Sequence, residues 1–335
     1  MLLGAGAPRY TLGGRECRID ARRRAVVAVS DPLVSVGNDR EPFDGRIRVS
    51  QTLEAPPALG PTGRPLRDFP VPPPPARTGA ARVVAVANQK GGVGKTTTTV
   101  NLGAALAGYG RRVLLVDFDP QGALSGTLQA RAEDVPTVYE LLRGTVADAQ
   151  DAVQPTAVPG LDLIPANIDL AAAELYLVNE VAREYALARV LRPVVDRYDV
   201  VLIDCQPSLG LLTVNALTAS AGVLVPLACE YLALRGVGLL VETIDKVRDR
   251  LNPALVLDGL LGTVYDGRTA HAREVLERVV REHGDDVLET VIGRTVKFPD
   301  ASAAGRSLLE HAPEHAGADA YRRLARELVS RGAVA

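Results

Sequence analysis

The sequence predicts a doubly wound α/β domain, in which a mostly parallel sheet carries helices on both faces. Its 335 residues are 47% hydrophobic and 23% charged, which is enough apolar material for one large core. From Arg82 onward, short runs rich in Val, Ile and Leu alternate with helical stretches. Such runs are typical of strands that are buried on both faces, and their alternation with helices predicts parallel crossover units. We therefore expect one domain over residues 82–332.

Each element of this domain follows from its own stretch of sequence. The expected strands are short apolar runs, in chain order Val83–Ala87, Val113–Asp117, Leu161–Pro165, Val200–Asp204, Gly222–Leu227, Val256–Val264 and Thr290–Ile292. The expected helices lie between or after them, at Thr97–Ala107, Glu184–Arg197, Leu234–Arg250, Arg273–Glu282 and Ala318–Ser330. No internal repeat interrupts this order.

Residues 1–81 have a different composition. They hold twelve of the 23 prolines, and they carry 12 Arg against 8 Asp and Glu. Such a segment buries too little apolar surface to offset its ordering entropy, so we expect it to be mostly disordered, with Pro70–Pro75 as a stiff spacer. It could be a weak basic arm for DNA or a partner, a dispensable tail, or the product of a start codon placed too early.

The overall composition excludes several classes of protein. A net charge of −2 gives no global basic field for nucleic acid, and the absence of Trp argues against a stacking platform for single strands. Three cysteines without a CxxC pair argue against disulfide, zinc and iron–sulfur frameworks. The chain opens without the apolar core of a signal peptide, and its most apolar stretch, residues 216–234, is broken by polar residues. We expect a cytoplasmic protein.

A phosphate-binding loop follows the first expected strand. A Gly-rich segment between a strand and a helix lets backbone amides and the helix N-terminus face an anion. Lys95 should reach the β- and γ-phosphates, and the Thr96 hydroxyl should ligate Mg²⁺. The expected nucleotide-binding residues are Lys90, Gly91, Gly92, Val93, Gly94, Lys95, Thr96 and Thr97.

The loop departs from the usual pattern at its start. The first Gly of that pattern would fall at Gln89, and a second lysine, Lys90, follows it. This arrangement is a deviant Walker A loop, and it resembles the ParA/MinD class of P-loop ATPases. In that class the early lysine crosses a dimer interface to the partner's nucleotide. The resemblance implies this catalytic role for Lys90.

Carboxylates end two of the expected strands. Because ligands bind outside the carboxyl ends of strands in open α/β sheets, Asp117, Asp119 and Asp204 should face the crevice of the phosphate loop. The pattern D-x-D-P-Q-G resembles the family's second motif, which implies that Asp119 positions the attacking water and that Asp117 supports the phosphate site. Asp204 ends an apolar Walker B strand and should hold Mg²⁺ together with Thr96.

Two nearby positions depart from the family pattern. The family usually has Asn where this chain has Ala123, and it has Pro where this chain has Gln206. The second change loosens a rigid turn beside the γ-phosphate.

Resemblance to the chromosome-segregation ParA/Soj branch covers roughly three quarters of the chain, from about Val83 onward. Members of this branch bind DNA without sequence preference as ATP-bound dimers, through basic residues at the positions of Arg268 and Lys297. Arg294 is a third candidate DNA contact in the same segment. Gly293 and Thr295 replace Pro and Asn of the family near the expected adenine pocket.

The resemblance implies a partitioning ATPase that uses ATP and Mg²⁺. It implies an ATP-bound homodimer on non-specific DNA, associated with the nucleoid and not with a membrane. It further implies a ParB-like adaptor that stimulates slow hydrolysis and releases the dimer, while the cargo stays open between chromosome, plasmid and another complex.

The main alternative is a MinD-like membrane ATPase, which would need an amphipathic C-terminal membrane helix. The end of this chain looks more like a helix that closes the core. An iron–sulfur carrier is disfavoured by the missing paired cysteines. An amide-forming ligase is disfavoured because no extra substrate domain is left over.

Overall fold

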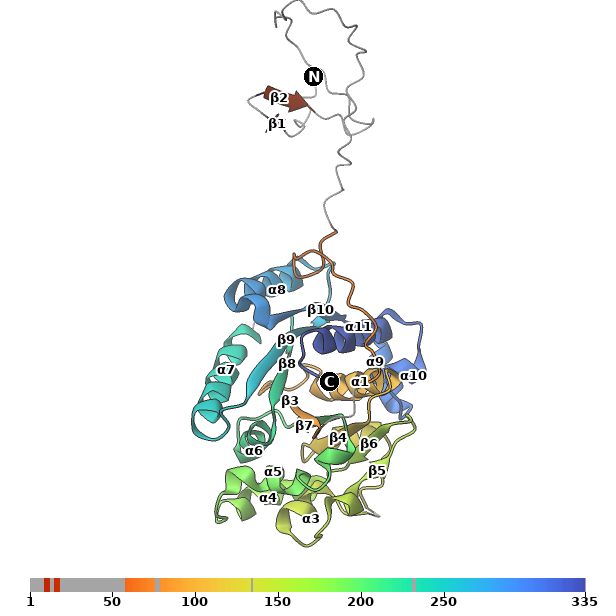
Figure 1. Cartoon of the computed structure of the whole chain (residues 1–335), viewed down its shortest axis with the longest axis vertical. Helices are drawn as coiled ribbons and strands as arrows, with labels where there is room; N and C mark the ends of the chain where they lie inside the picture. Colours follow the sequence, from red (N-terminus) through yellow and green to blue (C-terminus); the bar gives the residue numbers. More distant parts are fainter. Residues whose placement is uncertain are drawn as a thin grey trace, which may run out of the picture. The chain divides into compact units, whose positions relative to one another are not determined.

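The computed structural model describes residues 9–12, 15–18, 58–75, 79–133, 135–230 and 233–334. The chain divides into two compact units, Met1–Ala55 and Pro56–Ala335. The first unit contains an antiparallel pair of strands, β1 (Arg9–Leu12) and β2 (Arg15–Arg18), in which Tyr10 lies opposite Cys17 (Figure 1). The second unit contains all the other described elements.

An eight-stranded sheet forms the centre of the second unit. Its strand order is β10-β9-β8-β3-β7-β4-β6-β5, and every neighbouring pair is parallel except β5 with β6. This topology confirms the expected doubly wound α/β class. The strands are β3 (Arg82–Val86), β4 (Val113–Phe118), β5 (Gln154–Pro155), β6 (Leu161–Ile164), β7 (Val200–Cys205), β8 (Gly222–Ala228), β9 (Val256–Tyr265) and β10 (Val287–Gly293).

The central strands are buried on both faces, as their continuous apolar sequences predict. In β4, Leu114 and Val116 pack into one core cluster, whereas Val113 and Leu115 pack into the other. Strands β3 and β7 alternate in the same way. The sheet thus separates two apolar layers and leaves only the strand ends for polar chemistry.

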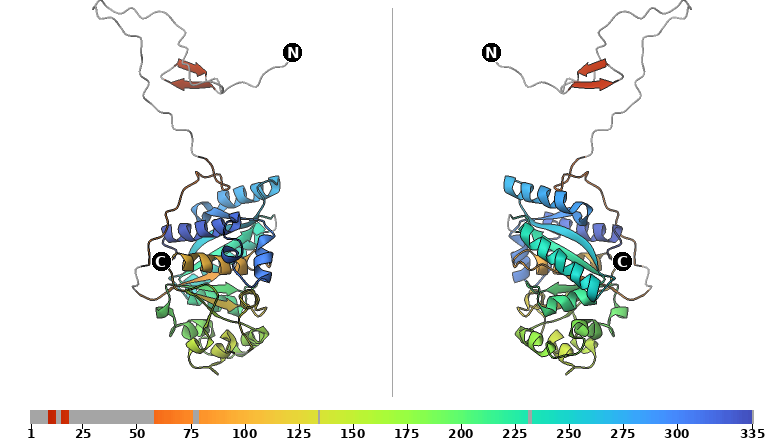
Figure 2. Two further views of the ribbon diagram at one scale, coloured as in Figure 1. Left: turned by 90° about the vertical axis from the view of Figure 1, so that its right-hand side faces the viewer. Right: turned by 90° about the vertical axis from the view of Figure 1, so that its left-hand side faces the viewer.

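Helices cover both faces of this sheet. Figure 1 shows α6 and α7 on one side and α1 and α11 on the other, and the two views of Figure 2 face these layers in turn. The helices are α1 (Lys95–Gly108), α2 (Ala123–Thr127), α3 (Val138–Arg143), α4 (Ala171–Leu177), α5 (Ala186–Leu191), α6 (Leu211–Ala219), α7 (Ala233–Arg250), α8 (Ala270–His283), α9 (Lys297–Ala303), α10 (Leu308–His311) and α11 (Ala316–Ser330).

One expected helix is broken. Residues 184–197 form a 3-10 turn, the short helix α5 and a second 3-10 turn at Val195–Arg197 instead of one helix. Pro193 lies between α5 and the second turn, and proline removes a backbone donor and clashes with the preceding helical turn. Several short elements were not predicted from the sequence, namely β5, α2, α3, α4, α6, α9 and α10.

Residues 58–75, which we call the strap, pack against helix α11. Arg323 donates a hydrogen bond to the Arg67 carbonyl at 2.6 Å, and Arg326 donates one to the Phe69 carbonyl at 3.3 Å. The Phe69 ring is 8% exposed and lies beneath the Arg323 guanidinium, 4.9 Å from it. The compact unit therefore begins at Pro56, whereas the composition suggested a boundary after residue 81.

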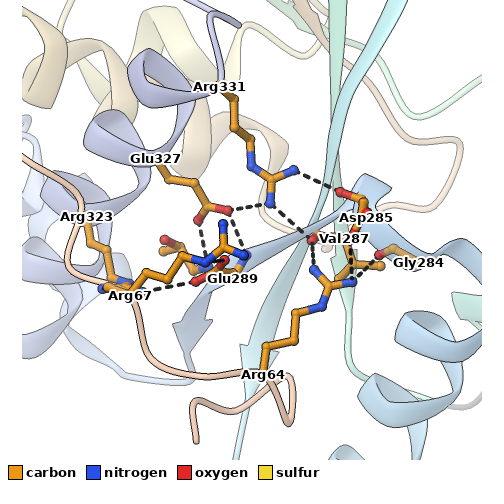
Figure 3. Close-up of polar contacts among 10 residues, drawn as sticks. Arg64, Arg67, Gly284, Asp285, Val287, Glu289, Arg323, Glu327 and Arg331 are labelled. Carbon is orange, nitrogen blue, oxygen red and sulfur yellow. Dashed lines mark hydrogen bonds and ion pairs between the residues drawn. The ribbon is translucent and has the colours of Figure 1, made fainter. Parts of the chain in front are cut away.

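The strap also reaches strand β10, which is the edge strand of the sheet (Figure 3). Arg64 donates to the carbonyl of Val287 at 2.9 Å and to that of Gly284, and Arg67 pairs with Glu289 at 3.2 Å. An edge strand presents backbone groups that can pair with another chain. The strap therefore covers part of β10 and occupies one of its exposed backbone acceptors, the Val287 carbonyl.

Helix α11 also binds the backbone of this edge strand, β10. The fully buried Glu327 carboxylate accepts hydrogen bonds from the backbone amides of Glu289 and Thr290, at 2.7 and 2.8 Å. Arg331 pairs with Glu327 at 2.8 Å. Two backbone donors of β10 are thus satisfied by one buried carboxylate, whose charge is balanced by an arginine.

Among the described residues, none of the helices combines the length and the apolar character needed to span a lipid bilayer.

Candidate functional site

The phosphate loop connects β3 to α1, in the context that the sequence predicts. Gly92 and Gly94 have φ values of 73° and 86°, a left-handed conformation that glycine adopts without steric cost. Helix α1 begins directly after Gly94, so its positive N-terminal end faces the loop. Asn88 donates to the Pro226 carbonyl and the Thr263 hydroxyl donates to the Val93 carbonyl, each at 2.8 Å. The loop is therefore fixed to strands β8 and β9.

Lys95 lies inside this loop. Its side chain is buried, and its ammonium donates to the Lys90 carbonyl at 3.2 Å. Burial lowers the pKa of Lys95, and the nearby carboxylates of Asp204 and Asp119 act in the opposite direction. A cation that is partly desolvated in this way gains from a polyphosphate held in the loop.

Asp204 and Thr96 form the candidate magnesium site. The Thr96 hydroxyl donates to Asp204 Oδ2 at 2.7 Å, and the carboxylate is 1% exposed at the end of β7. Burial, reinforced by the neighbouring Asp117, raises the pKa of Asp204 to about 8. A divalent cation would remove this penalty, and hydroxyl and carboxylate oxygens are ligands that Mg²⁺ prefers. The residues present therefore fit Mg²⁺.

Asp117 lies beside Asp204, because β4 pairs with β7 and the two aspartates are opposite each other in register. Its carboxylate accepts hydrogen bonds from the Ser125 backbone amide at 2.8 Å and from the Ser125 hydroxyl at 2.6 Å. Burial raises the pKa of Asp117 to about 6 despite these bonds. Asp117 thus anchors the start of α2, which agrees with a supporting role beside the phosphates.

Asp119 ends the same strand segment and is only 9% exposed. Its Oδ1 atom accepts a hydrogen bond from the Gln121 backbone amide at 2.9 Å. Gly122, with φ 59°, turns the chain here, and an added Cβ would lie 3.1 Å from the Ala166 carbonyl oxygen. The tight turn holds Asp119 at the carboxyl end of the sheet, in the electrostatic neighbourhood of Lys95.

Two cavities flank the phosphate loop. One of about 160 Å³ is lined by Gly92, Gly94, Thr263, Val264, Arg294, Thr295, Phe298 and Tyr321, among others. The other, of about 190 Å³, lies between α1 and the start of α2 and includes Thr96, Ala123 and Arg306. A larger hollow of about 520 Å³ includes Arg82 and Asp258 at the amino ends of β3 and β9, which is the wrong end of the strands for this chemistry.

Five residues of the first cavity were not found from the sequence. Thr263 and Val264 are at the end of β9, Ile292 is on β10, Phe298 is on α9 and Tyr321 is on α11. Phe298 and Tyr321 pack edge to face at 5.6 Å, and the Tyr321 hydroxyl shares a hydrogen bond with Thr98 at 3.1 Å. These side chains come from distant segments and follow no local motif. The φ of Val264, 51°, is a strained value for a β-branched residue, and strain of this kind gathers at ligand sites.

Lys90, the early lysine of the loop, pairs with Glu230 of the same chain. Its ammonium lies 2.8 Å from Glu230 Oε2, and both side chains are partly exposed. The Lys90 charge lowers the pKa of Glu230. Lys90 is thus held at the rim of the site.

The three candidate DNA contacts are exposed, and two of them have carboxylate partners. Arg268 binds both oxygens of Asp266 at 2.8–2.9 Å and lowers the pKa of that carboxyl to about 2. Lys297 lies 3.0 Å from Asp300. Arg294 differs from both, because it lines the cavity beside the phosphate loop.

Comparison with known proteins identifies the relatives of this arrangement. A family model described as an AAA domain matches residues 81–257. The chain is 47% identical over 252 residues to the sporulation initiation inhibitor protein Soj of Bacillus subtilis, which is 75% of this chain and 99% of that protein.

An uncharacterized protein of Mycobacterium tuberculosis is 57% identical over 274 residues, covering 82% of this chain and 86% of that protein. A continuous match of this length starts no later than residue 62 and therefore includes most of the strap.

Among solved structures, a protein of Mycobacterium smegmatis described as cobyrinic acid a,c-diamide synthase, with bound ADP and magnesium, superposes with a TM-score of 0.67. It is 47% identical, and the match covers 76% of this chain and 96% of that one.

Proposed function

Because the chain belongs to the Soj/ParA family of P-loop ATPases, we propose that it is a partitioning ATPase whose ATP-bound dimer binds DNA non-specifically until hydrolysis releases it. One observation carries the proposal most directly. Lys95, Thr96 and Asp204 converge at the carboxyl end of the sheet, inside a chain that matches Soj over nearly its whole length.

The site supports ATP hydrolysis through positioning and charge neutralisation. Lys95 and the loop amides bind the β- and γ-phosphates. Thr96 and Asp204 hold Mg²⁺, which when bound neutralises charge on the same phosphates. Asp119 orients the attacking water at the γ-phosphate, and Asp117 holds the segment that carries Asp119.

Dimerisation would complete the site. Lys90 leaves Glu230 and reaches the nucleotide of a second copy, so that two chains face each other across two ATP molecules. An exposed ion pair contributes only about 0–1 kcal/mol, so the exchange of Glu230 for a phosphate group costs little.

The DNA-binding surface would consist of Arg268, Lys297 and Arg294, of which Arg294 also lines the cavity beside the phosphate loop. Asp266 holds the Arg268 guanidinium in one orientation, and the arginine stays 90% exposed. Such contacts read phosphates and not bases, as non-specific binding requires. This surface would place the dimer on the nucleoid, where a ParB-like, DNA-bound adaptor stimulates hydrolysis.

The test is ATP turnover by the full chain, measured alone, with non-specific DNA, and with DNA plus a candidate ParB-like adaptor. We expect slow basal turnover, retention on DNA only with ATP, and faster turnover with release when the adaptor is added. An ATP turnover rate that changes neither with DNA nor with the adaptor would contradict the partitioning role.

Two alternatives are separated by the same assay. A MinD-like ATPase would be retained by anionic liposomes with ATP instead of by DNA. An amide-forming synthase, the activity given for the M. smegmatis protein, would hydrolyse ATP only with a carboxylic acid substrate and an amide donor. We favour partitioning because two relatives named for chromosome partitioning are 47–48% identical over 94–95% of their length.

A further inference from the structure

The segment Gln206–Gly210 begins two residues after the magnesium-site residue Asp204, which lies near the end of β7. It is folded by its own hydrogen bonds, from the Ser208 amide to the Gln206 carbonyl at 2.9 Å and from the Gly210 amide to the Ser208 hydroxyl at 3.2 Å. It connects the end of β7, the strand that carries Asp204, to the start of α6, so its conformation bears on how firmly that end of β7 is held. The segment contains Pro207 but not a second proline before it, so the backbone at Gln206 lacks the fixed φ of proline.

Glu174, on helix α4, contacts the start of this segment and the first turn of the helix that follows it. Glu174 Oε1 accepts a hydrogen bond from the Gln206 side-chain amide at 3.2 Å and one from the Leu212 backbone amide at 3.4 Å. Leu212 lies in the first turn of α6, where backbone amides have no partner within the helix. The N-cap residue of α6 is Gly210, which has no side chain to supply a cap. Glu174 therefore caps α6 from a neighbouring helix.

The contact requires a glycine at position 210, because the Glu174 carboxylate occupies the space of a side chain there. An added Cβ at Gly210 would lie 2.6 Å from Glu174 Oε1, closer than real atoms approach. The absence of a side chain at Gly210 lets the carboxylate reach Gln206 and Leu212 together. One half-buried oxygen thus joins α4, α6 and the segment between them.

We infer that Glu174 is a positioning residue for ATP hydrolysis, which fixes the Gln206–Gly210 segment beside Asp204 through the Gln206 side chain. In place of a rigid turn of two prolines, this chain uses an amide–carboxylate hydrogen bond. Glu174 does not touch nucleotide or metal, and it acts only through Gln206 and the start of α6. The inference rests on the ATPase activity of the chain and does not depend on DNA binding.

The test compares variants of the full chain by kcat and KM for ATP, at a temperature well below the melting point of each. For Glu174→Ala we expect kcat to fall about tenfold with KM changed less than twofold, because the phosphate loop is untouched while the hydrolytic geometry is loosened. Glu174→Gln keeps an acceptor of the same shape and should retain kcat within about threefold. Glu180→Ala is the matched control, since Glu180 is an exposed carboxylate just beyond α4 and should leave both constants unchanged.

A mutant cycle isolates the proposed route. Gln206→Ala removes the donor and leaves the α6 cap in place, so it tests the inference even if Glu174→Ala folds poorly. We expect the double variant Glu174→Ala, Gln206→Ala to have a kcat no lower than that of the slower single variant. The reason is that both substitutions remove the same hydrogen bond, between Gln206 and Glu174. In a Gln206→Pro background, Glu174→Ala should lower kcat by less than about threefold, because proline fixes the backbone of the turn without the side-chain hydrogen bond.

Equal costs of Glu174→Ala in the Gln206 and Gln206→Pro backgrounds would overturn the inference. So would a wild-type kcat in Gln206→Ala, or a KM that rises in step with the loss of kcat. A wild-type protein that does not hydrolyse ATP would refute the ATPase conclusion itself, so the two failures are distinguishable.

Discussion

The carboxyl end of the sheet and the strap-covered edge are both rich in buried charge, but they use it in opposite ways. At the nucleotide end, Asp117 and Asp204 lie side by side, and burial raises the pKa of each. At the edge, the buried carboxylates Glu289 and Glu327 each have an arginine partner, and Glu327 also accepts two backbone amides. The first region holds unbalanced charge that a nucleotide and a metal can neutralise, whereas in the second each of these carboxylates already faces an arginine.

This difference separates function from stability within one domain. Buried charges without a partner cost folding free energy until a ligand arrives, and pairing offsets part of this cost. We therefore expect changes at the nucleotide end to affect turnover with little loss of stability. Changes at the strap should do the reverse.

The largest expected effect is that of Lys95→Ala. Removal of the ammonium from the amide-lined loop should weaken ATP binding by a factor of roughly 100 or more, since charge-assisted bonds to several phosphate oxygens are lost. Isothermal titration with ATP and Mg²⁺ measures the affinity, and thermal melting without nucleotide should be unchanged. Near-normal affinity would remove the basis for the phosphate-loop assignment.

Next in size is the effect of deleting the strap. A protein that starts at residue 82 loses the burial of Phe69, about 2 kcal/mol, together with the arginine contacts to β10. We expect its melting temperature to fall by roughly 5–10 °C while the KM for ATP stays the same. A protein that starts at residue 58 keeps the strap and is the control, and it should melt like the full chain. If both truncated proteins melt alike, the strap does not stabilise the unit.

The Asp119→Ala variant tests the nucleotide end of the sheet without removing a phosphate-binding residue. The variant should bind ATP normally but hydrolyse it at least about tenfold more slowly, and accumulate as a dimer, because the water is no longer positioned. Gel filtration with ATP and a steady-state turnover assay measure the two properties. A monomer that hydrolyses at the normal rate would contradict the role of Asp119.

The smallest expected effect concerns DNA. With Arg268 and Lys297 both replaced by Glu, retention on every DNA sequence should weaken alike, and the salt dependence should lose about 0.9 in slope for each lost phosphate contact. ATP binding should persist. The truncated protein that starts at residue 58 is the control for the N-terminal arm, since it removes the arm and keeps the strap.

Loss of DNA retention in this truncated protein, with normal retention in the double Glu variant, would assign the contact to the arm instead of to Arg268 and Lys297.

What could be predicted from the sequence follows the same division. The positions of the phosphate loop, Asp119 and Asp204 at the strand ends were predictable, because each adjoins or ends the strand that positions it and a short motif describes that geometry. The burial of Asp117 against Ser125 depends on a contact eight residues away, and the Gln206–Glu174 bond on one 32 residues away. Neither contact has a local signature.

The strap could not be predicted for a stronger reason. Arg64 and its acceptor Val287 are separated by 223 residues. Composition alone favoured disorder here, because a proline-rich segment without apolar periodicity gives no sign of a partner. Likewise, the helix expected at residues 184–197 was placed by its periodicity, although Pro193 argued for a break.

The long separation between the strap and its partners has a consequence for biosynthesis. The strap is made well before its partners on α11, because Arg323 follows Arg67 by 256 residues. At translation rates of 5–20 residues per second, the strap waits roughly 13–51 s for its binding site on α11 to be made. During that time its prolines keep it out of competing helices and sheets. Docking of the strap therefore follows the synthesis of α11, and it is a late event of folding that joins two distant parts of the chain.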